Sequence, residues 1–239
     1  TERGFAVVRY ALEPEYAANR DRIAACDIVF IAVPTPTTPE GFDASTLETV
    51  LPLVGVGKIA VIKSTLLPGT TKKLQTQFPT ITVLHSPEFL RERTAAYDAS
   101  HPDRNIVGIP KDTAVCRQAA TQVHDVLPAA PYQATMDATD AELVKYAGNC
   151  FLYTKVVFMN LLYDVVVAEG GDFRAVREAF SKDPRIGDSH TQPVHESGRG
   201  AGGHCFIKDF EAFRRFYEAA IGKDEGLQML ASMIDYNNR

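Results

Sequence analysis

Short apolar segments alternate with longer amphipathic segments over the first 136 residues. Six of the apolar segments are rich in β-branched residues and are bounded by Pro, Gly, Asp or Thr, a pattern typical of β-strands. They are residues 5–10, 27–33, 59–65, 81–87, 105–110 and 131–136. The segments 43–54, 70–78 and 111–127 have helical periodicity and begin near Asp or Thr. This alternation predicts an α/β fold with a doubly wound, mostly parallel sheet.

The pattern changes after residue 136. Residues 137–171 have helical spacing and contain no proline, and their apolar positions extend most of the way around the helix. Further helices are predicted over 172–183, 209–221 and 226–236. We therefore divide the chain into an α/β domain, 1–136, and a helical domain, 137–239. A helix so apolar needs partners on several sides, so we expect it to be a spine between lobes or the interface of a homodimer.

Composition and charge restrict the classes of partner. The chain has 239 residues, of which 45% are hydrophobic, enough for one substantial core or two small ones. Its formal net charge of -5, without a basic block, argues against nucleic acid as a partner. No apolar run reaches the roughly 18 residues that cross a bilayer, and the first residues have no signal-peptide pattern. We therefore expect a cytoplasmic protein with no membrane partner.

The four cysteines are scattered and include no C-x-x-C pair, so we expect free thiols. Cys26, Cys116 and Cys150 lie in apolar periodic segments and are interpreted as packing residues. Cys205 is different, because it follows the glycine-rich residues 198–203. Glycines let a ligand approach the backbone closely, and the start of a following helix lowers a thiol pKa. Cys205 is therefore a candidate nucleophile.

Two further clusters carry possible chemistry. Ligands of doubly wound sheets bind at the carboxyl ends of strands, a rule that selects residues 33–37, 63–65 and 86–92. In the predicted long helix, Glu142, Lys145 and Asn149 follow at helical spacing and share one face. From these residues alone, a solvated ion pair between Glu142 and Lys145 is an equal alternative. The acids Glu88 and Glu92, taken alone, are more typical of a protein surface than of a catalytic site.

Six motifs in a fixed order resemble the nucleotide-sugar dehydrogenase (UDP-glucose/GDP-mannose dehydrogenase) family. They are "VPTPT", "KST", "SPEFLRE", "ELVKYAGNCFL", "DPRIG" and "GAGGHCFIKD". The resemblance that they mark extends over nearly all of residues 27–239. The resemblance implies a Rossmann-like NAD-binding domain followed by a helical dimerisation domain. It also implies a two-step oxidation of a nucleotide-sugar C6 alcohol to the carboxylate, of the UDP-glucose to UDP-glucuronate type, with NAD as the cofactor.

The resemblance assigns the catalytic roles. Cys205 adds to the aldehyde to form a thiohemiacetal, whose oxidation gives a thioester that water hydrolyses. Lys145 and Asn149 stabilise the developing oxyanion, with a water also held by Asp209. Asp209 and Glu88 are both candidates for proton transfer, and the sequence does not choose between them.

The resemblance also assigns binding roles. Thr65 and Glu92 line the nicotinamide side of the cofactor and Thr35 lines the cofactor cleft. Lys208 contacts the cofactor phosphates or lies at the mouth of the active site. Phe89 and Leu90 offer backbone groups to the substrate. Arg185 reaches the substrate of a neighbouring subunit, which makes a homodimer part of the site.

The sequence departs from the family pattern in several places. The family begins with a strand and a G-x-G-x-x-G turn that holds the pyrophosphate, whereas this chain starts one βα unit later, so we expect a short form or a fragment. Arg9 replaces an acid expected at the end of a strand, which leaves NADP as an alternative cofactor. Ala201 and His204 replace an aromatic residue and a serine, and the family's second Rossmann-like domain is not among residues 1–239.

Three functions remain open from the sequence. The first is the two-step dehydrogenase, which Cys205 favours. The second is a single-step β-hydroxyacid-type dehydrogenase, and the third is a non-catalytic relative that keeps the fold for binding or dimerisation. We expect no metal site, because His190 and His195 lack suitable spacing and carboxylate neighbours. His204 is a possible base for the thiol, although a histidine in a polar loop more often faces solvent.

Overall fold

The computed structural model describes residues 4–38, 41–195 and 198–239. Within elements, seven residues are described by their backbone alone, namely Thr37, Thr38, Gly41, Glu92, His195, His204 and Cys205. The chain forms two compact units, residues 1–145 and 146–239, and each is described by itself. The predicted division near residue 136 falls at the start of a long helix, whereas the units divide inside that helix.

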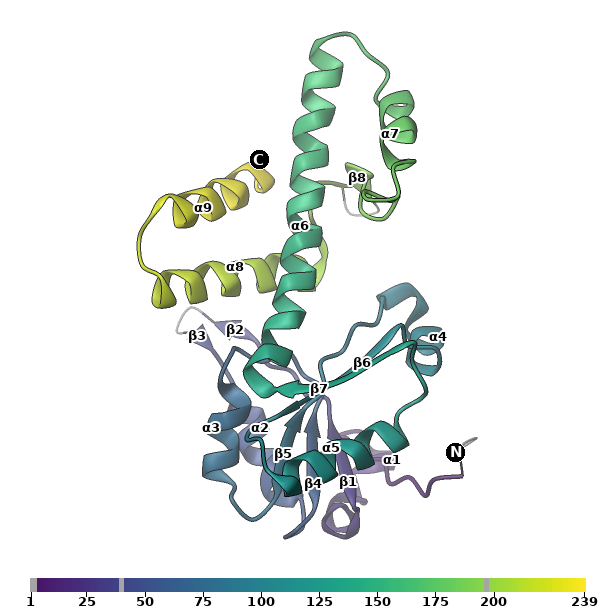
Figure 1. The fold of residues 1–239 in the computed structure, drawn as a ribbon, viewed down its shortest axis with the longest axis vertical. Coiled ribbons are helices and arrows are strands. Elements are labelled where there is room, and N and C mark those ends of the chain that lie inside the picture. The colour runs from purple at the N-terminus through teal and green to yellow at the C-terminus, as the bar shows by residue number, and fades with distance from the viewer. Residues whose placement is uncertain (1–3, 39–40, 196–197) are drawn as a thin grey trace. The chain divides into compact units, whose positions relative to one another are not determined.

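A five-stranded sheet forms the centre of the first unit (Figure 1). Its order is β1 (Ile28–Ile31), β4 (Ile59–Ile62), β5 (Thr82–His85), β6 (Arg104–Ile109) and β7 (Tyr132–Asp137). The first three strands are parallel in continuous register, and β6 and β7 are parallel to each other. β6 is antiparallel to β5, because the segment between them returns along the same end of the sheet. The prediction of a mostly parallel sheet is confirmed.

Helices cover both faces of the sheet. α2 (Ser45–Val50), continued by η2 (Leu51–Leu53), and α3 (Thr70–Gln77) pack on one face, and α5 (Ala114–Val126) packs on the other. The core under α2 and α3 includes Ile31, Leu47, Leu51, Ala60, Ile62, Leu74 and Val83. The core under α5 includes Ile59, Val61, Leu84, Val107, Ile109, Ala119, Ala120 and Val123. Successive strand residues alternate between these cores, which gives the predicted doubly wound arrangement.

The predicted strand over residues 5–10 is wrong. These residues form no strand, and Phe5 and Val7 are 40% and 56% exposed. A short apolar run becomes a strand only where a neighbouring strand satisfies its backbone groups, and here the Arg9 carbonyl accepts a hydrogen bond from Asn19 Nδ2 instead. Arg9 therefore does not stand at the end of a strand, which removes the premise of the argument for NADP.

Short elements complete the first unit. α1 (Pro14–Ala17) and the 3₁₀ helix η1 (Arg20–Ala25) precede the sheet, and β2 (Thr37–Thr38) pairs with β3 (Gly41–Phe42) as an antiparallel ribbon. The 3₁₀ helix η3 (Glu92–Thr94) and α4 (Ala95–Ser100) connect β5 to β6. This connection follows the motif "SPEFLRE", so the proposed site residues leave the sheet at its carboxyl edge.

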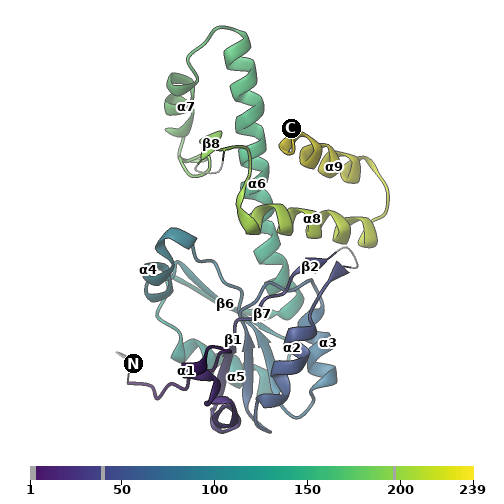
Figure 2. The same ribbon diagram turned by 180° about the vertical axis from the view of Figure 1, so that it is seen from behind.

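The long helix α6 (Ala138–Ala168) begins in the first unit and continues into the second. It is followed by α7 (Phe173–Ser181), the short antiparallel pair β8 (Val194–His195) and β9 (Gly198–Arg199), α8 (Gly203–Ala220) and α9 (Glu225–Asn237). Figure 2 shows α8 and α9 as a helical hairpin. α8 begins six residues before the predicted residue 209, so Cys205 lies in the first turn of a helix.

The surface of α6 is apolar on more than one side, as predicted. Tyr153 and Met159 are buried, and Tyr153 stacks on Phe210 of α8 with ring centroids 4.0 Å apart. An 18-residue window of α6 has a mean hydropathy of 1.6, enough by length and composition to cross a membrane, which corrects the expectation that no such run exists. Core helices of compact proteins meet the same criterion, so this composition assigns no membrane role.

Candidate active site

The loops after β1 and β4 are joined by side-chain hydrogen bonds at the carboxyl edge of the sheet. The Val33 N–H donates to Ser64 Oγ at 2.9 Å, and Ser64 Oγ donates to the Val33 carbonyl at 2.7 Å. Thr35 Oγ1 donates to the Thr65 carbonyl at 2.8 Å. The structure therefore brings together Thr35 and Thr65, the two threonines that the sequence assigns to the cofactor.

The loop after β5 brings Glu88 and Phe89 to Lys145, at the start of α6. Lys145 Nζ donates to the Glu88 carbonyl at 2.6 Å and lies 5.9 Å from the centre of the Phe89 ring. The Phe89 N–H donates to Glu88 Oε1 at 2.9 Å, so the carboxylate occupies a backbone donor that was predicted to face the substrate. The Glu88 side chain is 42% exposed, which leaves it accessible to a ligand.

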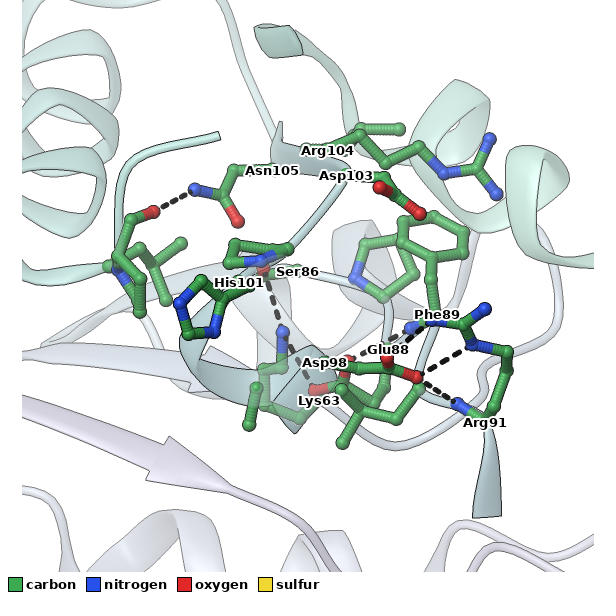
Figure 3. A pocket seen from close by; sticks show the side chains of 17 residues that line it. Lys63, Ser86, Glu88, Phe89, Arg91, Asp98, His101, Asp103, Arg104 and Asn105 are labelled. Atoms are coloured by element: carbon green, nitrogen blue, oxygen red, sulfur yellow. Dashed lines mark hydrogen bonds and ion pairs between the residues drawn. The ribbon is translucent and has the colours of Figure 1, made fainter. Parts of the chain in front are cut away.

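Lys63 is a site residue that the sequence analysis placed on the rim without giving it a role. Its Nζ lies 3.3 Å from Glu88 Oε2 and 3.2 Å from Ser86 Oγ (Figure 3). Burial lowers the pKa of Lys63, and the neighbouring Glu88 partly offsets this effect. Its role could have been predicted from its position directly after the apolar strand β4, because a lysine that is half-buried there needs an acidic partner.

A cavity of about 410 Å³ lies between residues 86–91, α4 and the beginning of β6 (Figure 3). Lys63 and Glu88 line one side, and Arg104 lies over the Phe89 ring with its Cζ 3.9 Å from the ring centre. Asp98 and Asp103 supply further carboxylates. A lining of paired acids and bases around one aromatic ring suits a polar, hydroxyl-bearing ligand better than an apolar one.

Asp98 fixes the conformation of the segment after Leu90. Its carboxylate accepts hydrogen bonds from the Arg91 backbone N–H at 2.9 Å, Arg91 Nε at 3.0 Å, Arg91 Nη2 at 2.6 Å and Thr94 Oγ1 at 2.9 Å. The Arg91 guanidinium holds the pKa of Asp98 well below its usual range. Glu92 lies between these partners in η3, but its side chain is outside the described residues.

His85 is fully buried at the end of β5 and was not singled out from the sequence. Its Nδ1 is 3.0 Å from the Ile62 carbonyl, and its Nε2 has no hydrogen-bond partner within the described part of the chain. Burial lowers the pKa of His85 to about 3, despite the hydrogen bond to Ile62. The ring is therefore neutral near pH 7 and acts as a packing residue beneath the rim.

Glu142 does not form the solvated pair with Lys145 that the sequence left open. The side chain is fully buried and caps the beginning of α3. It accepts hydrogen bonds from the Gly69 N–H at 2.5 Å, the Thr71 N–H at 2.8 Å and Thr71 Oγ1 at 2.6 Å. Burial raises the pKa of Glu142, and the three donors partly offset the rise. Glu142 thus attaches the first turn of α6, and with it Lys145, to the α/β unit.

Asn149, Lys208 and Asp209 meet in the second unit. Asn149 Nδ2 donates to Asp209 Oδ2 at 2.6 Å, and Lys208 Nζ donates to Asp209 Oδ1 at 2.5 Å. The Asp209 side chain is only 1% exposed, so both of its oxygens are engaged in a nearly dry environment. The ammonium of Lys208, which was predicted to face the cofactor phosphates or the active-site mouth, is paired with Asp209, and its contact with a cofactor stays a prediction.

Two of the three cysteines that were predicted to be packing residues are buried, and the third, Cys26, is not. Cys116 and Cys150 are buried, and burial raises the pKa of Cys150 to about 12, so neither is suited to be a nucleophile. Cys26 is half-exposed and does not pack in a core. The backbone of Cys205 lies in the first turn of α8, whereas its side chain, like that of His204, is outside the described residues.

Arg185 is exposed in the segment after α7. Its guanidinium pairs with Asp183, with Nη2 2.6 Å from Oδ2, and its side chain is 87% exposed. Lys155 Nζ holds the same segment by donating to the Ile186 carbonyl at 2.8 Å. This position leaves the guanidinium open to solvent, and its contact with a second subunit stays a prediction.

The described residues offer part of a nicotinamide cofactor site. Thr35 and Thr65 stand at the carboxyl edge of three parallel strands, where doubly wound folds bind such ligands. Among the described residues, no glycine-rich turn follows a strand of the five-stranded sheet, so the pyrophosphate cradle is not provided by these loops. The roles of Thr35 in the cofactor cleft and of Thr65 on the nicotinamide side stay predictions.

Two matches to protein families cover most of the chain. Residues 8–127 match the NAD-binding domain of the UDP-glucose/GDP-mannose dehydrogenase family, and residues 139–239 match the central domain of the same family. The NAD-binding match agrees with NAD as the predicted cofactor. The order of the two matches agrees with an α/β domain followed by a helical one.

Relatives and solved structures point to the same family. The chain is 32% identical over 233 residues to the UDP-glucose 6-dehydrogenase YwqF of Bacillus subtilis, covering 90% of this chain and 49% of that protein. It is 33% identical over 201 residues to the putative UDP-glucose 6-dehydrogenase YtcA of the same organism, covering 79% and 46%. A UDP-glucose dehydrogenase structure from Pyrobaculum islandicum superposes with a TM-score of 0.77 at 32% identity, covering 92% and 53%. The chain thus spans about half the length of the proteins it matches.

Proposed function

Because the chain belongs to the UDP-glucose/GDP-mannose dehydrogenase family, we propose that it carries the catalytic residues of an NAD-dependent nucleotide-sugar 6-dehydrogenase. The reaction is the oxidation of a C6 alcohol to the carboxylate, of the UDP-glucose to UDP-glucuronate type. The observation that carries the proposal is the buried Asp209, bonded to Asn149 and lying one helical turn after Cys205. A polar group this buried and this specifically paired, one helical turn along the backbone from a cysteine, suits the control of a proton or a water.

Cys205 is the nucleophile in this proposal. Its thiolate adds to the C6 aldehyde, forming the S–C bond while the C=O π electrons move to oxygen and take up a proton. When bound, NAD would supply the hydride acceptor for both oxidations at C6. The thiohemiacetal is thereby oxidised to a thioester, and attack by water breaks the S–C bond and releases the carboxylate and the thiol. The glycine-rich approach to Cys205 leaves room for the sugar.

Four other side chains act on charge and protons. Lys145 and Asn149 stabilise the oxyanion that develops at the sugar carbon. Asp209 holds Asn149 through Oδ2, and its Oδ1, which also pairs with Lys208, holds a water. Glu88 is the exposed alternative for proton transfer, since its carboxylate is more accessible than that of Asp209 and is accompanied by Lys63.

Binding roles follow the family motifs. Thr65 and Glu92 hold the nicotinamide side of NAD, and Thr35 lines the cofactor cleft. Lys208 lies at the cofactor phosphates or at the mouth of the active site. Phe89 and Leu90 contact the nucleotide sugar. We also propose a homodimer formed through residues 137–171, in which Arg185 contributes to the partner's substrate site, and a cytoplasmic location where NAD and nucleotide sugars are present.

The replacement Cys205→Ser in the complete gene product tests the mechanism. We expect formation of the sugar acid from UDP-glucose to be abolished or greatly slowed, because a hydroxyl is a weaker nucleophile near neutral pH and a poorer leaving group. Chromatography of the acid and mass spectrometry of the covalent intermediate are the measurements, with Cys26→Ser as the matched control. Acid formation at the wild-type rate by the Cys205→Ser protein would show that the thiol is structural.

A further inference from the structure

The backbone just before α8 is held by the last turn of α9. Asn237 Oδ1 accepts a hydrogen bond from the Ala201 N–H at 2.7 Å, and Asn237 Nδ2 donates to the Ala201 carbonyl at 3.0 Å. One amide side chain thereby satisfies both backbone groups of a single buried residue. This two-bond contact, which we call the Asn237 clasp, fixes Ala201 in position and orientation.

Gly200 allows the clasp to form. Its φ of +101° lies in the region that favours glycine, and a Cβ added there would stand 3.0 Å from Asn237 Oδ1. A side chain at residue 200 would therefore have to displace the amide that binds Ala201. The Asn237 clasp therefore explains why residue 200 is a glycine, in addition to any space that this glycine leaves for a ligand.

A second set of contacts holds the residue before Gly200. Arg199 Nε donates to Asn160 Oδ1 at 2.7 Å, and Arg199 Nη2 donates to the Asn160 carbonyl at 3.0 Å and pairs with Asp164. Tyr236 of α9 donates its hydroxyl to the same Asp164, at 2.5 Å from Oδ2. Two adjacent residues of α9 thus hold the two sides of Gly200: Asn237 binds Ala201 directly, and Tyr236 holds Arg199 through Asp164 of α6.

The clasp lies close to the beginning of the helix that carries the thiol. Gly202 is the N-cap residue of α8, and Cys205 follows in the first turn. We propose that Asn237 is a positioning residue for Cys205, because fixing Ala201 fixes where α8 begins and how its first turn is presented. This inference rests on the proposed function, in which Cys205 is the nucleophile. A thiol in a first helical turn is activated only while that turn keeps its place and its free N–H groups.

Alkylation of the thiol tests the proposal without requiring turnover. The 239-residue chain is treated with iodoacetamide across a pH series, and peptide mass spectrometry follows Cys205 and the buried Cys150 separately. We expect wild-type Cys205 to react with an apparent pKa below the ordinary value of about 8.5. In Asn237→Ala, we expect this apparent pKa to rise and the rate at neutral pH to fall about threefold or more. The neighbouring, exposed Asn238→Ala is the matched control and should behave as wild type.

Gly200→Ala perturbs the clasp from its other side and should produce the same shift. The reactivity of Cys150 reports whether a variant still folds, because this thiol is shielded only in the folded unit. An activated Cys205 that is unchanged in both variants overturns the positioning role and leaves the proposed function standing. A wild-type Cys205 with an ordinary pKa overturns both proposals. If both variants expose Cys150, Asn237 is a folding residue, and the positioning role is likewise overturned.

Discussion

His85 and Lys63 stand at the ends of neighbouring strands, and both are ionisable groups held in a largely apolar setting. His85 is fully buried with its Nδ1 at the Ile62 carbonyl, whereas the Lys63 ammonium reaches the buried Ser86 hydroxyl and the partly exposed Glu88 carboxylate. The difference follows from length, because a lysine side chain can carry its charge to a partner while an imidazole stays where the backbone puts it. His85 therefore remains neutral, and Lys63 is accommodated as half of an ion pair.

The buried His85 predicts a pH dependence of stability. Its folded pKa of about 3 lies below the ordinary value of about 6.5, so protons bind more strongly to the unfolded chain. The contribution of His85 is complete above about pH 6.5 and is lost as the pH falls toward about 3. Between these limits, wild type should lose up to about 1.4 kcal/mol of unfolding free energy per pH unit more than His85→Leu does.

Urea denaturation at several pH values measures this difference. His101→Gln is the control, because His101 is exposed and should leave the slope of the wild type unchanged. Equal slopes for wild type and His85→Leu would show that the His85 ring is hydrated or finds a partner for its proton.

At the scale of elements, Glu142 links α6 to α3. Its carboxylate satisfies the Gly69 and Thr71 N–H groups and the Thr71 hydroxyl, in the place of the side-chain cap that α3 lacks at its own N-cap, Gly69. A long helix whose apolar surface has no strong preferred face gains its register on the sheet from such a polar contact. The position of Lys145, one turn further along, depends on it.

Glu142→Ala should destabilise the chain by about 2 kcal/mol, because three buried donors lose their acceptor. The free energy of unfolding from urea denaturation is the measurement, and Glu169→Ala, at an exposed position after α6, is the control. A loss no greater than that of the control would mean that water replaces the carboxylate and that the link does not hold α6.

Some elements follow from the local sequence pattern, whereas others depend on the neighbours that the fold provides. α5 follows its sequence signals closely, since Thr113 accepts the hydrogen bond of the Cys116 N–H as an N-cap residue should. Residues 5–10 carry an equally good strand pattern and form no strand, because a strand depends on a neighbour that its own sequence does not contain. The strand β6 was predicted, but its antiparallel direction was not, because the path of the connection from β5 decides the direction of a strand.

For the whole molecule, the exposed apolar stripe of α6 predicts self-association. Phe151, Phe158, Leu161 and Val165 recur at helical spacing and are each about half exposed or more. Burial of such a stripe against a second copy removes large side chains from water. We expect a dimer by light scattering, and a monomer after the paired change Phe158→Lys and Leu161→Lys.

Ile221→Lys is the matched control, because Ile221 is exposed and apolar but lies after the end of α8. A wild-type monomer at micromolar concentration would contradict both the dimer and the proposed role of Arg185 in a partner's site.

The sequence by itself determined the doubly wound α/β class, the helical second half, five of the six predicted strands and the motifs that identify the family. These features depend on local periodicity and on short ordered motifs, which can be read without knowing which segments are neighbours. Only the tertiary structure decided the roles of Lys63, Asp98, Glu142 and Asn237. Each of these side chains contacts a residue that lies in another element or loop of the chain. A lone polar residue in a sequence does not specify its partner, because hydrogen bonds and burial are properties of the folded arrangement.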